Sequence, residues 1–187
     1  MLEDQAPGGV YGAWLDDYDS GNETPTHLVK THRPNSRLEI TANDVVLTSR
    51  RDLRDIAASA VLMGWCESDQ EILDFVRGAV EMHGYWQARA TAGVAYEEIV
   101  SAPGGCVEVI AHALGIEFDD TLTASVLTRL DALDGPVDGA RYNQETLLHE
   151  SHRRHGGLGY YPSILASETI EAINSEFEPW LKRYGHL

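Results

Sequence analysis

The chain has 187 residues, 43% of them hydrophobic, which suits one domain with a substantial core. Its 30 acidic residues outnumber its 14 Lys and Arg residues, and the formal net charge of −16 opposes binding to nucleic acid or to anionic lipid surfaces. A small anionic ligand stays open, because nearby Arg side chains and backbone amides set the field inside a pocket.

The two cysteines, Cys66 and Cys106, fit neither a disulfide framework nor a paired-cysteine metal motif. Two cysteines without a disulfide pattern favour a reducing compartment. No apolar run approaches the ~18 residues of a membrane span, and no basic stretch leads into an apolar run at the N-terminus. We expect a soluble, cytoplasmic protein with no membrane or nucleic-acid partner, and the sequence leaves its oligomeric state open.

The first half of the chain predicts two strands and two helices after an irregular start. Residues 1–26 contain turn formers and charges without a sustained period, and predict an irregular N-terminal segment. Strands are expected at 27–30 and 44–49. Apolar residues at helical spacing then predict a helix over 53–64, and Ser68 with Glu71 in capping-box spacing predicts a second, longer one.

The second half continues the alternation. A short strand is expected at 93–96, followed by helices with apolar stripes at 107–114 and 122–133. A last helix is expected to begin at a Ser167 cap and to run to Leu181. Strands alternating with helices indicate an α/β fold, with a mainly parallel sheet flanked by helices in one domain over 27–187.

Two polar clusters directly follow predicted strands, where α/β folds bind ligands. Lys30-Thr31-His32 follows the first strand, and Arg50-Arg51 follows the second. Ser59 lies eight residues after Arg51, about two helical turns, so both side chains point to roughly the same side and can hold one phosphate. The alternative is a solvated helix face, on which Arg51 and Arg54 have Asp52 and Asp55 as local partners.

Four segments in order resemble motifs of the sulfotransferase family, which transfers sulfuryl from 3′-phosphoadenosine 5′-phosphosulfate. Residues 28–34 resemble the segment with the catalytic histidine, and residues 45–59 the strand and helix whose Arg and Ser grip the 3′-phosphate. Residues 96–99 resemble the Tyr-Glu-Asp-Leu segment, and residues 154–161 the Arg-Lys-Gly-x-x-Gly-Asp-Trp loop that closes over that phosphate. The resemblance implies a nucleotide-binding architecture of the P-loop type and a small-molecule acceptor with a hydroxyl or amine.

The resemblance also implies the role of each matching residue. His32 would be the general base that removes the acceptor proton, and Lys30 would stabilise the bridging oxygen of the leaving group. No metal ion is implied. The cofactor-binding residues it implies are Arg51, Ser59, Tyr96, Arg154, His155 and Gly156.

Two features depart from the family pattern. His155 stands where the family usually has Lys, which replaces a permanent cation by a group that is mostly neutral near pH 7. The family's N-terminal phosphate loop, a basic residue followed by Ser-Gly-Thr-Thr-Trp, is not found; residues 7–14 have glycines and a Trp without Lys, Arg or a hydroxyl pair. Either the sequence begins downstream of the domain start, or the protein has lost donor activation and kept the fold.

Two other functions stay open. A non-catalytic module with the same fold would keep the 3′-phosphate grip without transfer. A metal-dependent hydrolase is suggested by His149, His152 and His155 beside Glu150. On a regular helix, however, the first and last of these histidines point about 120° apart and do not easily share one ion.

Overall fold

The computed structural model describes residues 8–34, 38–131, 142–143, 146–147 and 157–187. The chain divides into two compact units. Unit 1 comprises Met1–Val45 and Pro103–Arg154, and unit 2 comprises Val46–Ala102 and His155–Leu187. The boundaries therefore differ from the predicted single domain over 27–187.

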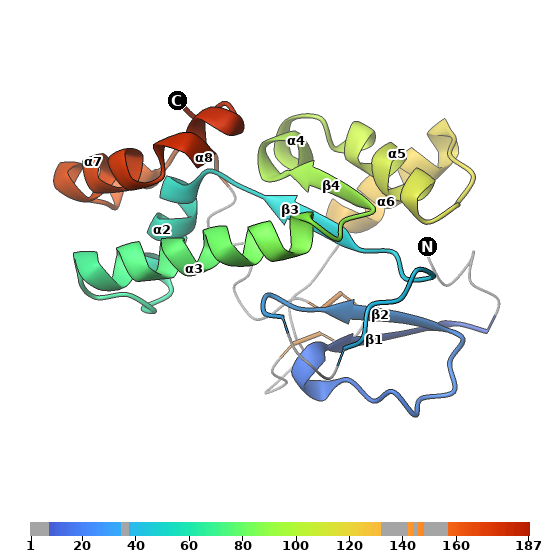
Figure 1. Cartoon of the computed structure of the whole chain (residues 1–187). Coiled ribbons are helices and arrows are strands. Elements are labelled where there is room, and N and C mark those ends of the chain that lie inside the picture. Colours follow the sequence, from blue (N-terminus) through green and yellow to red (C-terminus); the bar gives the residue numbers. More distant parts are fainter. Residues whose placement is uncertain (1–7, 35–37, 132–141, 144–145, 148–156) are drawn as a thin grey trace. The chain divides into compact units, whose positions relative to one another are not determined.

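Unit 1 contains a pair of parallel strands, β1 (Val10–Trp14) and β2 (Thr26–Lys30), drawn in blue in Figure 1. Strand β2 confirms the strand predicted at 27–30. Strand β1 lies inside the segment that we expected to be irregular, so that prediction was wrong. Its β-branched and aromatic residues favour an extended backbone, and pairing with β2 satisfies its hydrogen bonds, which a single short segment cannot reveal.

The connection from β1 to β2 begins with a short 3-10 helix, η1 (Leu15–Asp17). Unit 1 also contains helices α5 (Pro103–Ala113) and α6 (Asp120–Asp131), as predicted from their apolar stripes. Helix α5 ends where Gly115 adopts a φ of 66°, and the amide of Ile116 donates to the carbonyl of Ala111. Gly suits this left-handed position because it has no Cβ.

Unit 2 contains the second parallel pair, β3 (Leu47–Arg50) and β4 (Ala92–Ala95), connected by two helices. The coarse α/β class is confirmed, with short parallel strands and flanking helices. The described residues form two separate two-stranded sheets, whereas we expected one larger sheet. The helices of unit 2 are α2 (Leu53–Leu62), α3 (Asp69–Gln87), α4 (Tyr96–Ser101), η2 (Tyr161–Ser163), α7 (Ser167–Glu176) and α8 (Glu178–Arg183).

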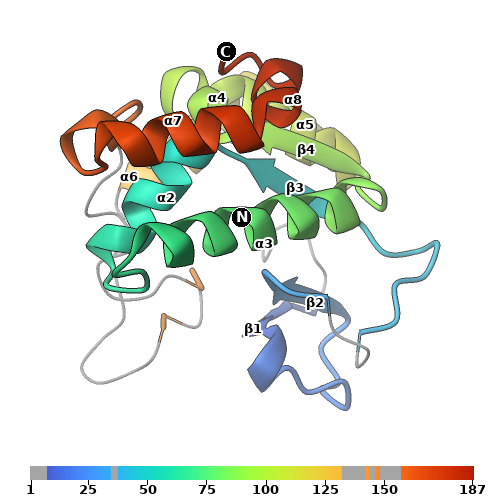
Figure 2. The ribbon, with the colours of Figure 1, turned by 60° about the vertical axis from the view of Figure 1, so that its left-hand side comes forward.

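Helix α2 lies between α3 and α7, as Figures 1 and 2 both show. Ala57 and Ala58 of α2 are completely buried, so the neighbouring helices approach its backbone closely. The predicted capping box at the start of α3 is present: the Glu71 amide donates to the Ser68 hydroxyl, and the Glu71 carboxylate accepts from the Ser68 amide. The core of unit 2 consists of Leu53, Ala57, Ala58, Ala60, Cys66, Ile72, Val76, Leu165, Ile173, Phe177 and Leu181.

The last predicted helix is in fact two helices. Helix α7 begins after Ala166, which has no side-chain cap, so the predicted Ser167 cap was wrong. The helical backbone is interrupted at Phe177, and α8 starts with Pro179 in its first turn. A proline has no N–H to continue the preceding helix and favours a helix start, which explains the interruption.

Candidate functional site

The carboxyl ends of β3 and β4 bring two predicted site residues together. Arg50 and Ala95 are paired in the strand register, so the residues that follow them, Arg51 and Tyr96, emerge side by side. The guanidinium carbon of Arg51 lies 4.2 Å from the ring centre of Tyr96 and 5.3 Å from that of Tyr160. Two aromatic faces thus hold a guanidinium at the edge of the sheet where α/β folds bind ligands.

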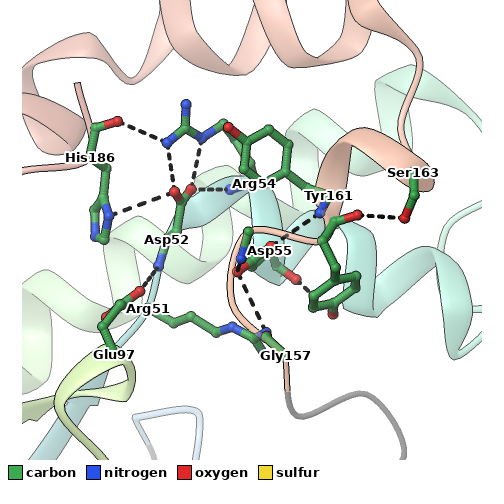
Figure 3. Close-up of polar contacts among 11 residues, drawn as sticks. Arg51, Asp52, Arg54, Asp55, Glu97, Gly157, Tyr161, Ser163 and His186 are labelled. Carbon is green, nitrogen blue, oxygen red and sulfur yellow. Dashed lines mark hydrogen bonds and ion pairs between the residues drawn. The ribbon is translucent and has the colours of Figure 1, made fainter. Parts of the chain in front are cut away.

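The segment Gly157–Tyr161 lies against the first turns of α2. Arg51 Nη2 donates to the carbonyl oxygen of Gly157 over 2.9 Å (Figure 3). The carboxylate of Asp55 accepts from the amide of Gly159 over 2.8 Å and from the amide of Tyr161 over 3.2 Å. The described part of the predicted phosphate loop therefore lies beside Arg51. The predicted residues Arg154, His155 and Gly156 lie outside the described residues.

Asp55 is a residue that sequence reasoning missed as part of this site. Its side chain is 1% exposed, and its carboxylate lies 3.6 Å from Nη2 of Arg51. We had considered it only as a partner on a solvated helix face. The signal was available in α2, since its central residues 56–58 and 60–62 are apolar on every side, and a helix of that kind is buried.

Arg54 also contradicts the solvated-face alternative, because it is only 8% exposed. Its guanidinium makes two hydrogen bonds to the Asp52 carboxylate, over 2.6 and 2.9 Å, and a third to the carbonyl of His186 over 2.8 Å (Figure 3). The hydrogen bonds that Arg54 donates to Asp52 raise the pKa of Arg54, and the face of Tyr161 lies 4.6 Å away. Arg54 joins the start of α2 to the C-terminal residues and has a structural role.

Ser59 is half-buried on α2, two turns after the strand end. Its hydroxyl makes no hydrogen bond to any described residue, and no described contact joins it to Arg51. The structure therefore agrees with the predicted helical position of Ser59. Among the described residues, the Ser59 hydroxyl stabilises the fold through no hydrogen bond.

Two buried polar atoms, one of Arg51 and one of Glu97, show whether an anion fits at this place. Within the described part of the chain, neither Arg51 Nε nor Glu97 Oε2 has a hydrogen-bond partner. The other oxygen of Glu97 accepts from the Asp52 amide over 3.0 Å. The free Nε–H of Arg51 fits a phosphate oxygen, whereas Glu97 and Asp55 add negative charge nearby. A phosphate must therefore depend on directed N–H donors rather than on a strong positive field.

Lys30 and His32, the predicted catalytic residues, both contact Trp14 in unit 1. Lys30 Nζ lies 4.6 Å from the ring centre of Trp14, and the His32 ring meets the edge of that ring at 5.3 Å. Lys30 also donates to the carbonyl of Leu147 over 3.2 Å. Burial lowers the pKa of Lys30, while His32 is exposed. The structure thus places the two predicted catalytic side chains around one aromatic ring.

The segment after β1 does not resemble a phosphate loop. Residues 10–14 form the strand itself, and η1 contains Asp16 and Asp17. Carboxylates at this place repel a phosphosulfate group rather than bind it. The described residues therefore suit a phosphate beside Arg51 better than one after β1.

No group of three or more His, Cys, Asp or Glu that could hold a metal ion occurs among the described residues. The candidate cluster of His149, His152 and His155 lies outside them.

None of the described helices is both long and apolar enough to cross a membrane. Comparisons of the chain with protein-family models, with curated proteins and with solved structures found no match.

Proposed function

We propose that the chain is a sulfotransferase, which moves a sulfuryl group from 3′-phosphoadenosine 5′-phosphosulfate to a hydroxyl or amine of a small acceptor. The observation that carries the proposal is the junction of three segments at Arg51. Tyr96 and the segment Gly157–Tyr161 are far from Arg51 in sequence, yet both contact its side chain. Each of the three resembles a family motif at the nucleotide site, so their contact supports a shared nucleotide site.

In this proposal unit 2 holds and orients the nucleotide. The Nε–H of Arg51 and the hydroxyl of Ser59 donate to the 3′-phosphate, which does not change during the reaction. Tyr96 lies near the adenosine. The hydrogen bonds of Asp55 to Gly159 and Tyr161 fix the loop beside Arg51. Such fixed donors reduce the entropy lost when the reacting group is positioned.

In this proposal Lys30 and His32 are the residues that move a proton and stabilise charge. The bound donor provides a sulfuryl group whose transfer, like phosphoryl transfer, needs mostly positioning and charge stabilisation. With the donor bound, His32 would take the proton of the acceptor hydroxyl, and the acceptor oxygen would take the sulfuryl group. Lys30 would stabilise the charge on the leaving adenosine 3′,5′-bisphosphate.

A transfer assay with sulfur-labelled donor, and with p-nitrophenol and benzylamine as acceptors, tests the proposal. His32→Ala should lower transfer by about 10²–10⁴-fold, because the general base is lost. Its affinity for adenosine 3′,5′-bisphosphate should stay unchanged. His112→Ala, which removes an exposed histidine of α5, is the matched control. Equal turnover by His32→Ala and the wild type would exclude His32 from the mechanism.

A second function is favoured by the acidic segment after β1. Asp16 and Asp17 stand where a sulfotransferase needs donors for the phosphosulfate. A nucleotide-binding module that keeps the 3′-phosphate site without transfer accounts for these residues. Wild-type protein that binds adenosine 3′,5′-bisphosphate and transfers sulfuryl to neither acceptor would favour the module over the enzyme.

A further inference from the structure

We propose that Trp14 is the positioning residue for Lys30 and His32, an inference that rests on the proposed transferase function. Trp14 is the Trp of residues 7–14, which lack the basic residue and the hydroxyl pair of the family's phosphate loop, so the resemblance assigns Trp14 no role. The strand register places it directly beside Lys30, at the carboxyl ends of β1 and β2. Both strands end there, so the side chains of the two residues stand next to each other on the same side of the pair.

The Trp14 ring holds the ammonium group of Lys30 without using its hydrogen-bond donors. Lys30 Nζ lies 4.6 Å from the ring centre, a distance typical of a cation–π contact. One of its three N–H groups donates to the carbonyl of Leu147. Among the described residues no other acceptor contacts this ammonium group. Two N–H donors therefore remain to stabilise an oxygen of the leaving group.

The position of Leu147 indicates that this contact is imposed by the fold. Leu147 is 3% exposed and has a φ of 55°, the only positive φ at a residue other than Gly within the described part of the chain. A bulky side chain in the left-handed region is strained, and such strain persists only where the surroundings enforce it. The carbonyl of Leu147 and the face of Trp14 thus hold the Lys30 ammonium group between them.

The same ring orients the histidine. The His32 ring meets Trp14 at an interplanar angle of 60°, with 5.3 Å between the ring centres. Tyr142 packs on Trp14 from another direction, at 6.3 Å. Trp14 is itself half-buried, so these contacts restrict its rotamer. A fixed ring between a general base and a cation sets the distance between them, which an exposed histidine cannot do alone.

Steady-state kinetics of Trp14→Leu test this role, with Trp14→Phe as the conservative variant. Trp14→Leu should lower kcat by about 10–100-fold, because small misplacements of catalytic groups have effects of this size. The affinity for adenosine 3′,5′-bisphosphate should not change. Trp14→Phe should restore most of kcat, since it keeps an aromatic face. Trp65→Leu, at a side chain that is 62% exposed in unit 2, is the matched control.

An NMR measurement adds a reading that does not depend on turnover. The aromatic ring current should move the Lys30 Hε signals upfield in the wild type and in Trp14→Phe, and the shift should disappear in Trp14→Leu. Wild-type kcat in Trp14→Leu, or Lys30 signals without an upfield shift, would overturn the role of Trp14 while transfer itself persists. Absence of transfer by the wild type would instead overturn the proposed function, and the role of Trp14 with it.

Discussion

The start of α2 in unit 2 and the end of the β1–β2 pair in unit 1 hold their charged groups in different ways. At the start of α2, Arg54 and Asp55 are buried and have several hydrogen-bond partners each. At the end of the strand pair, Lys30 is held by one carbonyl and one aromatic face. The paired charges at the start of α2 fix the positions of their side chains, whereas the two weaker contacts of Lys30 leave N–H donors of its ammonium group available. The first arrangement suits orientation of a ligand, and the second suits a change of charge.

The largest expected effect is that of Asp55→Ala. The substitution leaves the amides of Gly159 and Tyr161 without their acceptor and removes the carboxylate beside Arg51. We expect the free energy of unfolding to fall by about 3–5 kcal/mol, the usual effect of breaking a buried, hydrogen-bonded ion pair. Urea denaturation followed by circular dichroism measures it.

Asp74→Ala is the matched control for that experiment. Asp74 also pairs with an arginine, Arg77, but its side chain is 57% exposed. Solvent screens such a pair, so its loss should change stability by less than about 1 kcal/mol. Equal effects of the two substitutions would contradict the structural role of Asp55.

A smaller effect is expected for Lys30→Met in unit 1. Its aliphatic side chain can still pack on Trp14, and it removes an ammonium group that burial disfavours. Unfolding free energy at neutral pH should change by less than about 1 kcal/mol, while transfer falls. A loss comparable to that of Asp55→Ala would show that the two regions are held alike.

The same variant has a predicted pH dependence. Burial places the pKa of folded Lys30 below the value of 10.5 for an unperturbed lysine. Between these two pKa values the unfolded chain binds more protons than the folded one, so stability gains a contribution as pH rises through this window. The wild type should therefore gain stability relative to Lys30→Met when the pH rises toward 10.5. Parallel pH profiles of the two proteins would contradict the lowered pKa.

Much of unit 2 could be predicted because its signals are local. Each signal lies within one helix: the apolar spacing in α2 and in α3, and the capping box of Ser68 and Glu71 at the start of α3. Pro179 could also have shown that the last helix is interrupted. Strand β1 could not be identified in this way. It is short, and it is stabilised by pairing with β2, which the sequence of β1 alone does not show.

The candidate site was predictable only in part for the same physical reason. The resemblance to family motifs was enough to predict that Arg51, Tyr96, Lys30 and His32 belong to a site. The acceptor for Lys30 lies 117 residues away in sequence, and a backbone carbonyl carries no sequence pattern. Asp55 was missed because an acidic residue beside an arginine is usually solvated, and because the amides that donate to it, those of Gly159 and Tyr161, lie 104 and 106 residues away in sequence.

The central claim, that unit 2 binds a 3′-phosphate through Arg51 and Ser59, is tested most directly by titration calorimetry with adenosine 3′,5′-bisphosphate and adenosine 5′-monophosphate. Ser59→Ala is the decisive variant, since the Ser59 hydroxyl has no hydrogen bond to a described residue and alanine favours the helix. Ser175→Ala, at an exposed serine of α7, is its control.

The wild type should bind the bisphosphate at least about tenfold more tightly than the monophosphate, and Ser59→Ala should remove about tenfold of that preference, the usual value of one hydrogen bond to a charged group. Ser175→Ala should not change it. Equal affinity of the wild type for both nucleotides, or an unchanged preference in Ser59→Ala, would contradict the assignment of this site to a 3′-phosphate.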